Sequence, residues 1–147
     1  MMKTNEDHMR RAICLARAQH GRTGDNPAVG CVIVDRGGRV LSEGATADGG
    51  RPHAEQLALD ALKPGIARGA IAYVTLEPCR ERSTGEDACS RRLIEAGVEK
   101  VFISVMDQHP KGSGGKAALE AAGIEVETGL LEEKAARLYQ DFFASLG

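Results

Sequence analysis

Hydrophobic and polar residues alternate along the chain in segments long enough to predict its helices and strands. Residues 5–20 place apolar side chains on one stripe, preceded by Thr4 and Asn5 as candidate caps, so an amphipathic helix is expected there. Residues 28–35 form an apolar run rich in valine and isoleucine, which is typical of a strand buried on both faces. A glycine-containing turn joins this run to residues 40–45, and the two segments predict an antiparallel hairpin.

The remainder of the chain alternates helices with strands. Helices are expected at residues 52–62, 88–97, 116–122 and 130–146, and strands at residues 70–76, 100–106 and 124–128. This alternation predicts parallel strand pairing with right-handed crossovers, which places helices on both faces of one sheet. We therefore expect an α/β fold with a five-stranded mixed sheet, and a single domain spanning residues 1–147.

Composition and charge narrow the class of protein. Hydrophobic residues make up 42% and charged residues 27%, as in soluble globular proteins, and no apolar run approaches the ~20 residues of a membrane span. A net charge of −2 and few aromatic residues (3%, no Trp) argue against a nucleic-acid surface and favour a small-molecule substrate. The first ten residues are too rich in charge for the apolar core of a secretory signal, which favours the reducing cytoplasm.

Two short motifs carry the candidate chemistry. Residues 52–55 read Pro-His-Ala-Glu, and residues 77–79 read Glu-Pro-Cys, with Cys89 following after nine intervening residues. The imidazole of His53 and the thiolates of Cys79 and Cys89 suit a tetrahedral Zn²⁺ whose fourth position is left for water. Zinc lowers the pKa of bound water from about 15.7 toward ~7 and so supplies hydroxide at neutral pH. The order of residues resembles the signature of zinc nucleobase deaminases, in which the cysteines lie closer together.

Glu55 is the candidate proton carrier of this site. A carboxylate is a poor ligand beside two thiolates, but it can take a proton from water and pass it to a substrate nitrogen. With Pro52 as the first residue of a helix, His53 and Glu55 would lie in its first turn, and Cys89 in the first turn of another. Positive helix ends would favour deprotonated thiols. The alternative, a Cys79–Cys89 disulfide, is disfavoured by a reducing compartment.

Other residues receive weaker interpretations. Asp107 follows the strand expected at residues 100–106, and ligands bind outside the carboxyl ends of parallel strands, so it belongs beside the zinc site. Residues 111–116, Lys-Gly-Ser-Gly-Gly-Lys, precede a helix and could cradle an anion, although a flexible turn is the more ordinary interpretation. Cys14 and Cys31 lie inside apolar runs and are predicted to be plain buried thiols.

Longer stretches of the chain resemble one branch of the zinc deaminases. They are residues 25–34, 52–55, 73–79, 93–98, 121–126 and 129–131. Together they resemble the deaminase domain of the bifunctional deaminase/reductase of riboflavin biosynthesis. The resemblance implies a cytidine deaminase-like three-layer α/β/α sandwich, and hydrolytic deamination of an aminopyrimidine ribosyl phosphate with release of ammonia.

The resemblance also implies the roles of individual residues and a state of assembly. It gives zinc ligands at His53, Cys79 and Cys89, a proton carrier at Glu55, and substrate contacts at Asn26 and Asp107. The family's habit favours a homodimer or higher homo-oligomer. The chain ends where that family's reductase half would begin, so a stand-alone deaminase or an isolated domain is expected, and a separate reductase partner is left open.

The departures from the family pattern lie where substrate specificity should be set. The family usually carries His-x-Gly-x-Thr-Pro-Pro-Cys after the first cysteine, whereas residues 80–89 read Arg-Glu-Arg-Ser-Thr-Gly-Glu-Asp-Ala-Cys and lack the ring-contacting histidine. Thr46 stands where a histidine is common, and Gln-His-Pro at residues 108–110 replaces the usual Pro-Asn-Pro. Arg80 and Arg82 are candidates to bind a phosphate or other anion, with solvated surface arginines as the alternative.

Three functions are compatible with these features. The leading hypothesis is a zinc hydrolase that deaminates a small aminopyrimidine or a related nucleoside or nucleobase. A tRNA or nucleic-acid adenosine or cytidine deaminase is the second, and the acidic balance weighs against it. The third is a zinc-stabilised binding module without activity, but an intact Glu55 argues against it because a purely structural site has no use for that carboxylate.

Overall fold

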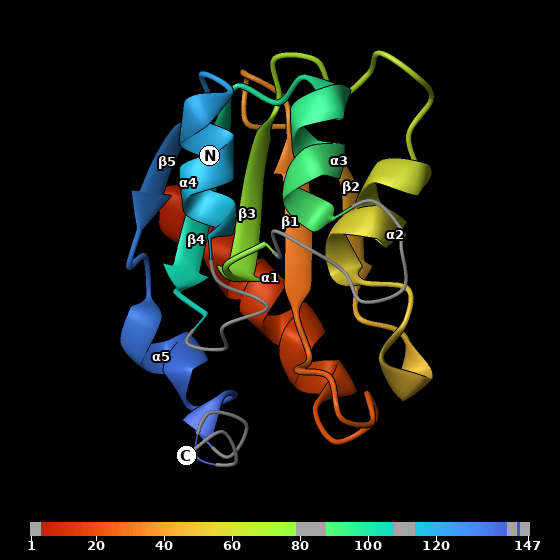
Figure 1. Cartoon of the computed structure of the whole chain (residues 1–147), viewed down its shortest axis with the longest axis vertical. Helices are drawn as coiled ribbons and strands as arrows, with labels where there is room; N and C mark the ends of the chain where they lie inside the picture. The colour runs from red at the N-terminus through yellow and green to blue at the C-terminus, as the bar shows by residue number, and fades with distance from the viewer. Residues whose placement is uncertain (1–3, 79–87, 108–113, 141–143, 145–147) are drawn as a thin grey trace.

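One mixed sheet of five strands organises the molecule (Figure 1). The computed structural model describes residues 4–78, 88–107, 114–140 and 144. The strands are β1 (Gly30–Val34), β2 (Val40–Ala45), β3 (Ile71–Leu76), β4 (Lys100–Val105) and β5 (Glu125–Thr128), in the order β2-β1-β3-β4-β5. β1 pairs antiparallel with β2 and β3, whereas β3, β4 and β5 run parallel. The predicted five-stranded mixed sheet is confirmed.

Helices cover both faces of this sheet. They are α1 (Asn5–Gln19), α2 (Ala54–Asp60), α3 (Cys89–Ala96), α4 (Gly115–Ala121) and α5 (Glu132–Ala136), with a short 3₁₀ turn η1 (Asp48–Gly50). Figure 1 shows α2, α3 and α4 side by side in front of the sheet and α1 behind it. α2, α3 and α4 all begin at the end of the sheet where β3 and β4 finish (Figure 1). Within the described ranges, no helix has the length and apolar character needed to cross a membrane.

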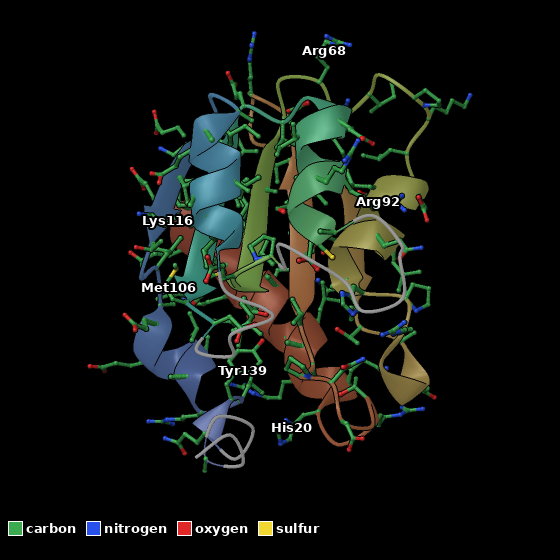
Figure 2. The ribbon with its side chains drawn as sticks, viewed as in Figure 1. His20, Arg68, Arg92, Met106, Lys116 and Tyr139 are labelled. Carbon is green, nitrogen blue, oxygen red and sulfur yellow. The ribbon has the colours of Figure 1, made fainter. Side chains whose placement is uncertain are left out.

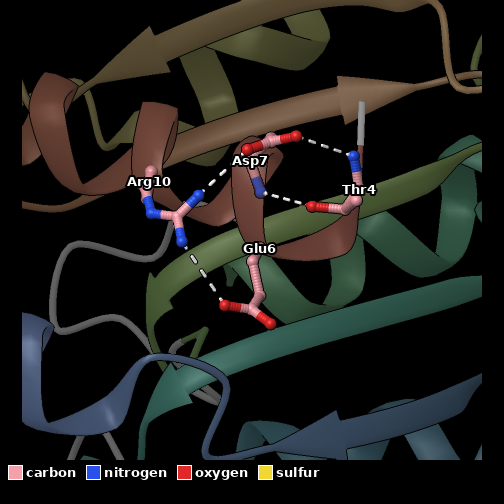
Figure 3. A network of polar contacts seen from close by, with 4 residues as sticks. All are labelled: Thr4, Glu6, Asp7 and Arg10. Carbon is pink, nitrogen blue, oxygen red and sulfur yellow. Dashed lines mark hydrogen bonds and ion pairs between the residues drawn. The ribbon is translucent and has the colours of Figure 1, made fainter. Parts of the chain in front are cut away.

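Helix α1 begins where its sequence predicts. The Thr4 hydroxyl accepts a hydrogen bond from the Asp7 backbone N–H at 3.2 Å, and the Asp7 carboxylate accepts one from the Thr4 N–H at 3.0 Å (Figure 3). This capping box satisfies two backbone donors at the helix start, and the hydrogen bond from the Thr4 backbone N–H to the Asp7 carboxylate is the largest cause that holds the pKa of Asp7 below its usual value. One turn later Arg10 pairs with both Asp7 and Glu6. The apolar stripe of α1 is fully buried against the sheet.

The start of α2 differs from the prediction. The helix begins at Ala54, and His53 is its N-cap with an extended backbone (φ −72°, ψ 159°). Pro52 therefore lies before the helix and not at its first position, and the Arg51–Pro52 peptide bond is cis. The reason is that an N-cap residue keeps extended dihedrals, so the chain turns into the helix only after His53.

The predicted final helix is interrupted. One helix was expected through residues 130–146, but α5 ends at Ala136 and residues 137–139 form a turn, after which the described residues 140 and 144 are again helical. The turn lets the Tyr139 side chain enter the core, where its hydroxyl contacts the carbonyl oxygen of Ala28. A contact to a distant part of the chain thus overrides the local helical pattern.

The two cysteines predicted to be buried have different environments. Cys31 lies in β1 and is completely buried, as predicted. Cys14 is exposed, so the prediction for it is wrong. Its position falls beside the buried stripe of α1 and not on it, because side chains share a helix face only at spacings of three or four.

Gly44 allows α2 to pack directly on β2. A Cβ atom at this position would lie 2.4 Å from the carbonyl oxygen of Ala54 and 2.8 Å from the backbone nitrogen of Ala58. Both atoms belong to the helix backbone, which cannot move aside without moving the whole helix. Because Gly44 has no side chain, α2 can lie this close to the sheet. The same helix carries His53 and Glu55 at its start.

We expect Gly44→Ala to lower the free energy of unfolding by about 2 kcal/mol, because a methyl group overpacks the contact between α2 and β2. Urea denaturation measures this change. Gly37→Ala is the matched control, since its Cβ would meet only the Asp35 side chain at 3.3 Å. We expect the control to stay within about 0.5 kcal/mol of the parent protein. Equal losses in both variants would contradict the proposed close approach.

Candidate active site

His53 and Cys89 meet at the beginnings of α2 and α3. The His53 Nδ1 atom lies 3.4 Å from the Cys89 Sγ atom, although the residues are 36 positions apart in sequence. In a tetrahedral zinc site, with Zn–N near 2.0–2.1 Å and Zn–S near 2.3 Å, two such ligands lie about 3.6 Å apart. Cys89 is fully buried as the first residue of α3, as its sequence predicts. The pair therefore has the donor types and the spacing that one zinc ion requires.

The third predicted ligand lies outside the described residues. Cys79 falls in the stretch between Pro78 and Ala88 that the structure does not describe, as do the candidate anion-binding residues Arg80 and Arg82. Among the residues that are described, no group of three or more His, Cys, Asp or Glu side chains forms a metal cluster. The fit to zinc thus rests on the imidazole–thiol pair, and the role of Cys79 stays a prediction.

Glu55 occupies the first turn of α2, two residues after His53. Glu55 is only 3% exposed to solvent. The positive end of the helix favours its negative charge there. Burial raises the pKa of the Cys31 thiol in β1 well above its usual value, and the charge of the Glu55 carboxylate raises it further. The structure therefore holds Glu55 in the interior beside the candidate zinc pair.

Asn26 is held in the loop that precedes β1. Its Nδ2 atom donates a hydrogen bond to the Gly50 carbonyl at 3.0 Å, and its own carbonyl accepts one from the Thr23 hydroxyl at 2.6 Å. Gly50 has a φ of +99°, and a Cβ there would lie 2.6 Å from that Nδ2 atom. The contact ties the loop to η1, which leads into His53. The predicted contact of Asn26 with substrate stays a prediction.

Thr46 has a structural role that the sequence did not indicate. The residue is 1% exposed, and its hydroxyl accepts a hydrogen bond from the Val29 backbone N–H at 3.0 Å. The Thr46 N–H in turn donates to the Val29 carbonyl at 3.0 Å. These bonds join the end of β2 to the start of β1. Thr46 therefore holds these two strand ends together from a buried position.

Asp107 lies just beyond the end of β4, as predicted. Its backbone N–H donates to the Glu77 Oε1 atom at 3.2 Å. His109 follows two residues later and lies outside the described residues. The position of Asp107 agrees with the rule that ligands bind at the carboxyl ends of parallel strands, and its contact with substrate stays a prediction.

Glu77 is a buried carboxylate whose role the sequence did not reveal. It directly follows β3 and is 4% exposed. Its Oε1 atom binds Asp107, and its Oε2 atom accepts hydrogen bonds from the backbone N–H groups of Gly114 and Lys116, at 3.2 and 2.9 Å. The glycine-rich segment at residues 111–116 was expected to cradle an anion or to form a flexible turn. In its described part, the anion is the carboxylate of Glu77.

A ring of hydrogen bonds fixes the loop that enters β1. The Gly30 N–H donates to the Thr75 hydroxyl oxygen at 3.0 Å, the Thr75 and Tyr139 hydroxyls lie 2.7 Å apart, and the Tyr139 O–H donates to the Ala28 carbonyl at 2.7 Å. Because the single phenolic hydrogen goes to Ala28, the Thr75 hydroxyl must donate to the phenolic oxygen. Each hydrogen bond in the ring therefore has a fixed donor and a fixed acceptor.

Tyr139 also lies in the electrostatic field of two predicted site residues. Burial raises the pKa of its phenol, the hydrogen bond from Thr75 lowers it, and the charges of Glu55 and Asp107 raise it further. The net effect is a pKa well above the usual value, so the phenol keeps its proton. Figure 2 shows Tyr139 toward the end of the molecule where β3 and β4 finish, and Arg68 at the opposite end.

Comparison with known proteins identifies similar sequences over most of the chain. The profile of a family described as "Cytidine and deoxycytidylate deaminase zinc-binding region" matches residues 2–105. Riboflavin biosynthesis protein RibD of Actinobacillus pleuropneumoniae is 45% identical over 141 residues, which are 95% of this chain and 37% of that protein. The chain spans little more than a third of the length of the curated relatives that it matches.

Solved structures show the same fold. A crystal structure from Thermotoga maritima, described as a diaminohydroxyphosphoribosylaminopyrimidine deaminase/5-amino-6-(5-phosphoribosylamino)uracil reductase, has a TM-score of 0.88 at 37% identity and covers 95% of this chain and 40% of that one. RibD of Acinetobacter baumannii has a TM-score of 0.88 at 41% identity and covers 96% of this chain and 39% of that one. The similarity concerns one region of each longer relative.

We expect Tyr139→Phe to lower the free energy of unfolding by about 1–3 kcal/mol, because it leaves the Ala28 carbonyl buried without its donor. Urea denaturation measures the loss. In a double-mutant cycle with Thr75→Val, the combined loss should be smaller than the sum of the single losses, since both changes break the same ring. Additive losses would contradict the ring as the source of the stabilisation.

Proposed function

Since the chain belongs to the cytidine and deoxycytidylate deaminase zinc-binding family, we propose that it is a zinc-dependent hydrolytic deaminase of a small aminopyrimidine ribosyl phosphate. The observation that carries the proposal is the 3.4 Å approach of His53 Nδ1 to Cys89 Sγ, with the buried Glu55 in the helix turn that follows His53. When bound, zinc supplies a water molecule activated at neutral pH. The remaining chemistry belongs to the chain's own residues.

Glu55 moves the protons of the reaction. Its carboxylate accepts a proton from the attacking water and passes it to the ring nitrogen next to the carbon that bears the amine. A second proton transfer then converts the amine into ammonia as the carbon–nitrogen bond breaks. Overall, one water molecule is consumed and one ammonia is released, and Glu55 ends in its starting state. Burial of Glu55 keeps the transfer away from bulk solvent.

Two observations support the proposed substrate class: the names of the relatives, and the position of the site at the carboxyl ends of the parallel strands. Relatives such as RibD of Actinobacillus pleuropneumoniae are named for riboflavin biosynthesis, and the Thermotoga maritima structure is described as a diaminohydroxyphosphoribosylaminopyrimidine deaminase/5-amino-6-(5-phosphoribosylamino)uracil reductase. We assign the base contacts to Asn26 and Asp107. Arg80 and Arg82 are assigned to the phosphate, whose charge matches their guanidinium groups.

Assembly and location remain predictions. A homo-oligomer is expected from the family's habit, and a reducing cytoplasm from the charged start of the chain. Sedimentation of the purified protein would measure the state of assembly.

We expect Glu55→Gln to lower kcat at least about a hundredfold while zinc stays bound, because an amide cannot carry the proton. Ammonia release and zinc content are measured on the same sample. Glu43→Gln is the matched control: it makes the same chemical change at a carboxylate that is bound to Arg11 and lies outside the site. Ammonia release by Glu55→Gln at the parent rate would refute the assigned role.

A substrate panel tests the class of molecule. We expect the aminopyrimidine ribosyl phosphate to have the highest kcat/KM, and removal of its phosphate to lower that value about tenfold or more, because charge-assisted hydrogen bonds are lost. Cytidine, adenosine, guanine and tRNA complete the panel, with ammonia as the readout. Deamination of tRNA with a steep dependence on salt concentration would instead support a nucleic-acid deaminase.

A further inference from the structure

The buried carboxylate of Glu77 has no part in the proposed reaction. It is almost fully buried at the end of β3, and it accepts three backbone hydrogen bonds from two separate segments. Oε1 binds the N–H of Asp107, and Oε2 binds the N–H groups at the start of α4. A buried charge of this kind is stable only when donors surround it, so the position of each donor is tied to the others.

A second contact joins the same two parts of the chain. A Cβ atom on Gly115 would lie 1.8 Å from the carbonyl oxygen of Pro78, so the start of α4 packs directly on the backbone that follows β3. Figure 2 shows Lys116 on α4, near the end of that helix that faces the carboxyl ends of β3 and β4. The two residues that follow β3, Asp107 beyond β4 and the first residues of α4 thus form one unit around Glu77.

We infer that Glu77 is a positioning residue for the substrate: its carboxylate fixes the Asp107 backbone relative to the end of β3, two residues before the candidate metal ligand Cys79 in the sequence. The inference rests on the proposed function, in which Asp107 contacts the substrate base. Glu77 itself does not touch the substrate. It acts through the Asp107 backbone, whose N–H it holds at 3.2 Å, and so fixes the backbone position from which the Asp107 side chain extends.

Glu77→Gln separates this role from general stability. A glutamine side chain has one acceptor oxygen, so either Asp107 or the start of α4 loses its acceptor and faces an N–H group. We expect KM to rise about tenfold or more, while kcat changes less than about threefold and the zinc content equals that of the parent protein. Glu77→Asp keeps the charge on a shorter side chain, and we expect a smaller rise in KM.

Tyr73→Phe is the structural control. It removes a hydrogen bond of 2.5 Å from the Tyr73 hydroxyl to Asn5 on the face of the sheet covered by α1. We expect this variant to lose stability while its KM stays at the parent value. If Glu77→Gln loses stability in the same way and leaves KM unchanged, Glu77 is merely structural and the inference is wrong.

Amide hydrogen exchange gives a readout that needs no turnover. We expect exchange at Asp107 and Lys116 to accelerate about tenfold or more in Glu77→Gln, and to stay unchanged in Tyr73→Phe. If the parent protein releases no ammonia from any aminopyrimidine, the proposed function fails, and the exchange rates still decide whether Glu77 holds Asp107. Unchanged exchange at Asp107 would overturn the inference.

Discussion

Two carboxylates, Glu55 and Glu77, are buried, and each is two positions in sequence from a candidate metal ligand. The fold therefore has to provide hydrogen-bond donors or positive charge around each of them. A carboxylate that leaves water loses several kcal/mol of solvation unless donors or positive charge replace it. Glu77 receives three backbone N–H groups, and Glu55 lies in the first turn of α2. The helices begin at this end of the sheet, so their unpaired N–H groups are available where the acidic residues lie.

The parallel pairing of β3 with β4 brings these groups together. Because both strands end at the same edge of the sheet, the residues that follow them meet there, although they are about thirty positions apart. The helix between these two strands is α3, which begins at the same edge of the sheet. Its first residue, Cys89, therefore lies there as well. The close contact of Gly44 with α2 then brings His53 within 3.4 Å of that cysteine.

Local sequence patterns predicted most of this architecture, because helix and strand periods depend on neighbouring residues. The stripe of α1, the buried strand β1 and the start of α3 all lie within two residues of their predicted bounds. The site residues His53, Glu55 and Cys89 could be found because short motifs carry them. The roles of Glu77 and Tyr139 could not, since most of their partners are backbone groups that leave no mark on the side-chain sequence, and Thr75 lies 64 positions from Tyr139. The end of α5 was mispredicted for the same reason.

The ring that joins Ala28 to Tyr139 spans 111 positions of the chain. During synthesis on the ribosome, the segment that enters β1 emerges long before the residue that completes its hydrogen bonds. The hydrogen bonds that link Ala28 and Thr75 to Tyr139 can therefore form only after the residues between them have been synthesised. Contacts of such long range slow folding and prolong the exposure of apolar surface in the incompletely folded chain.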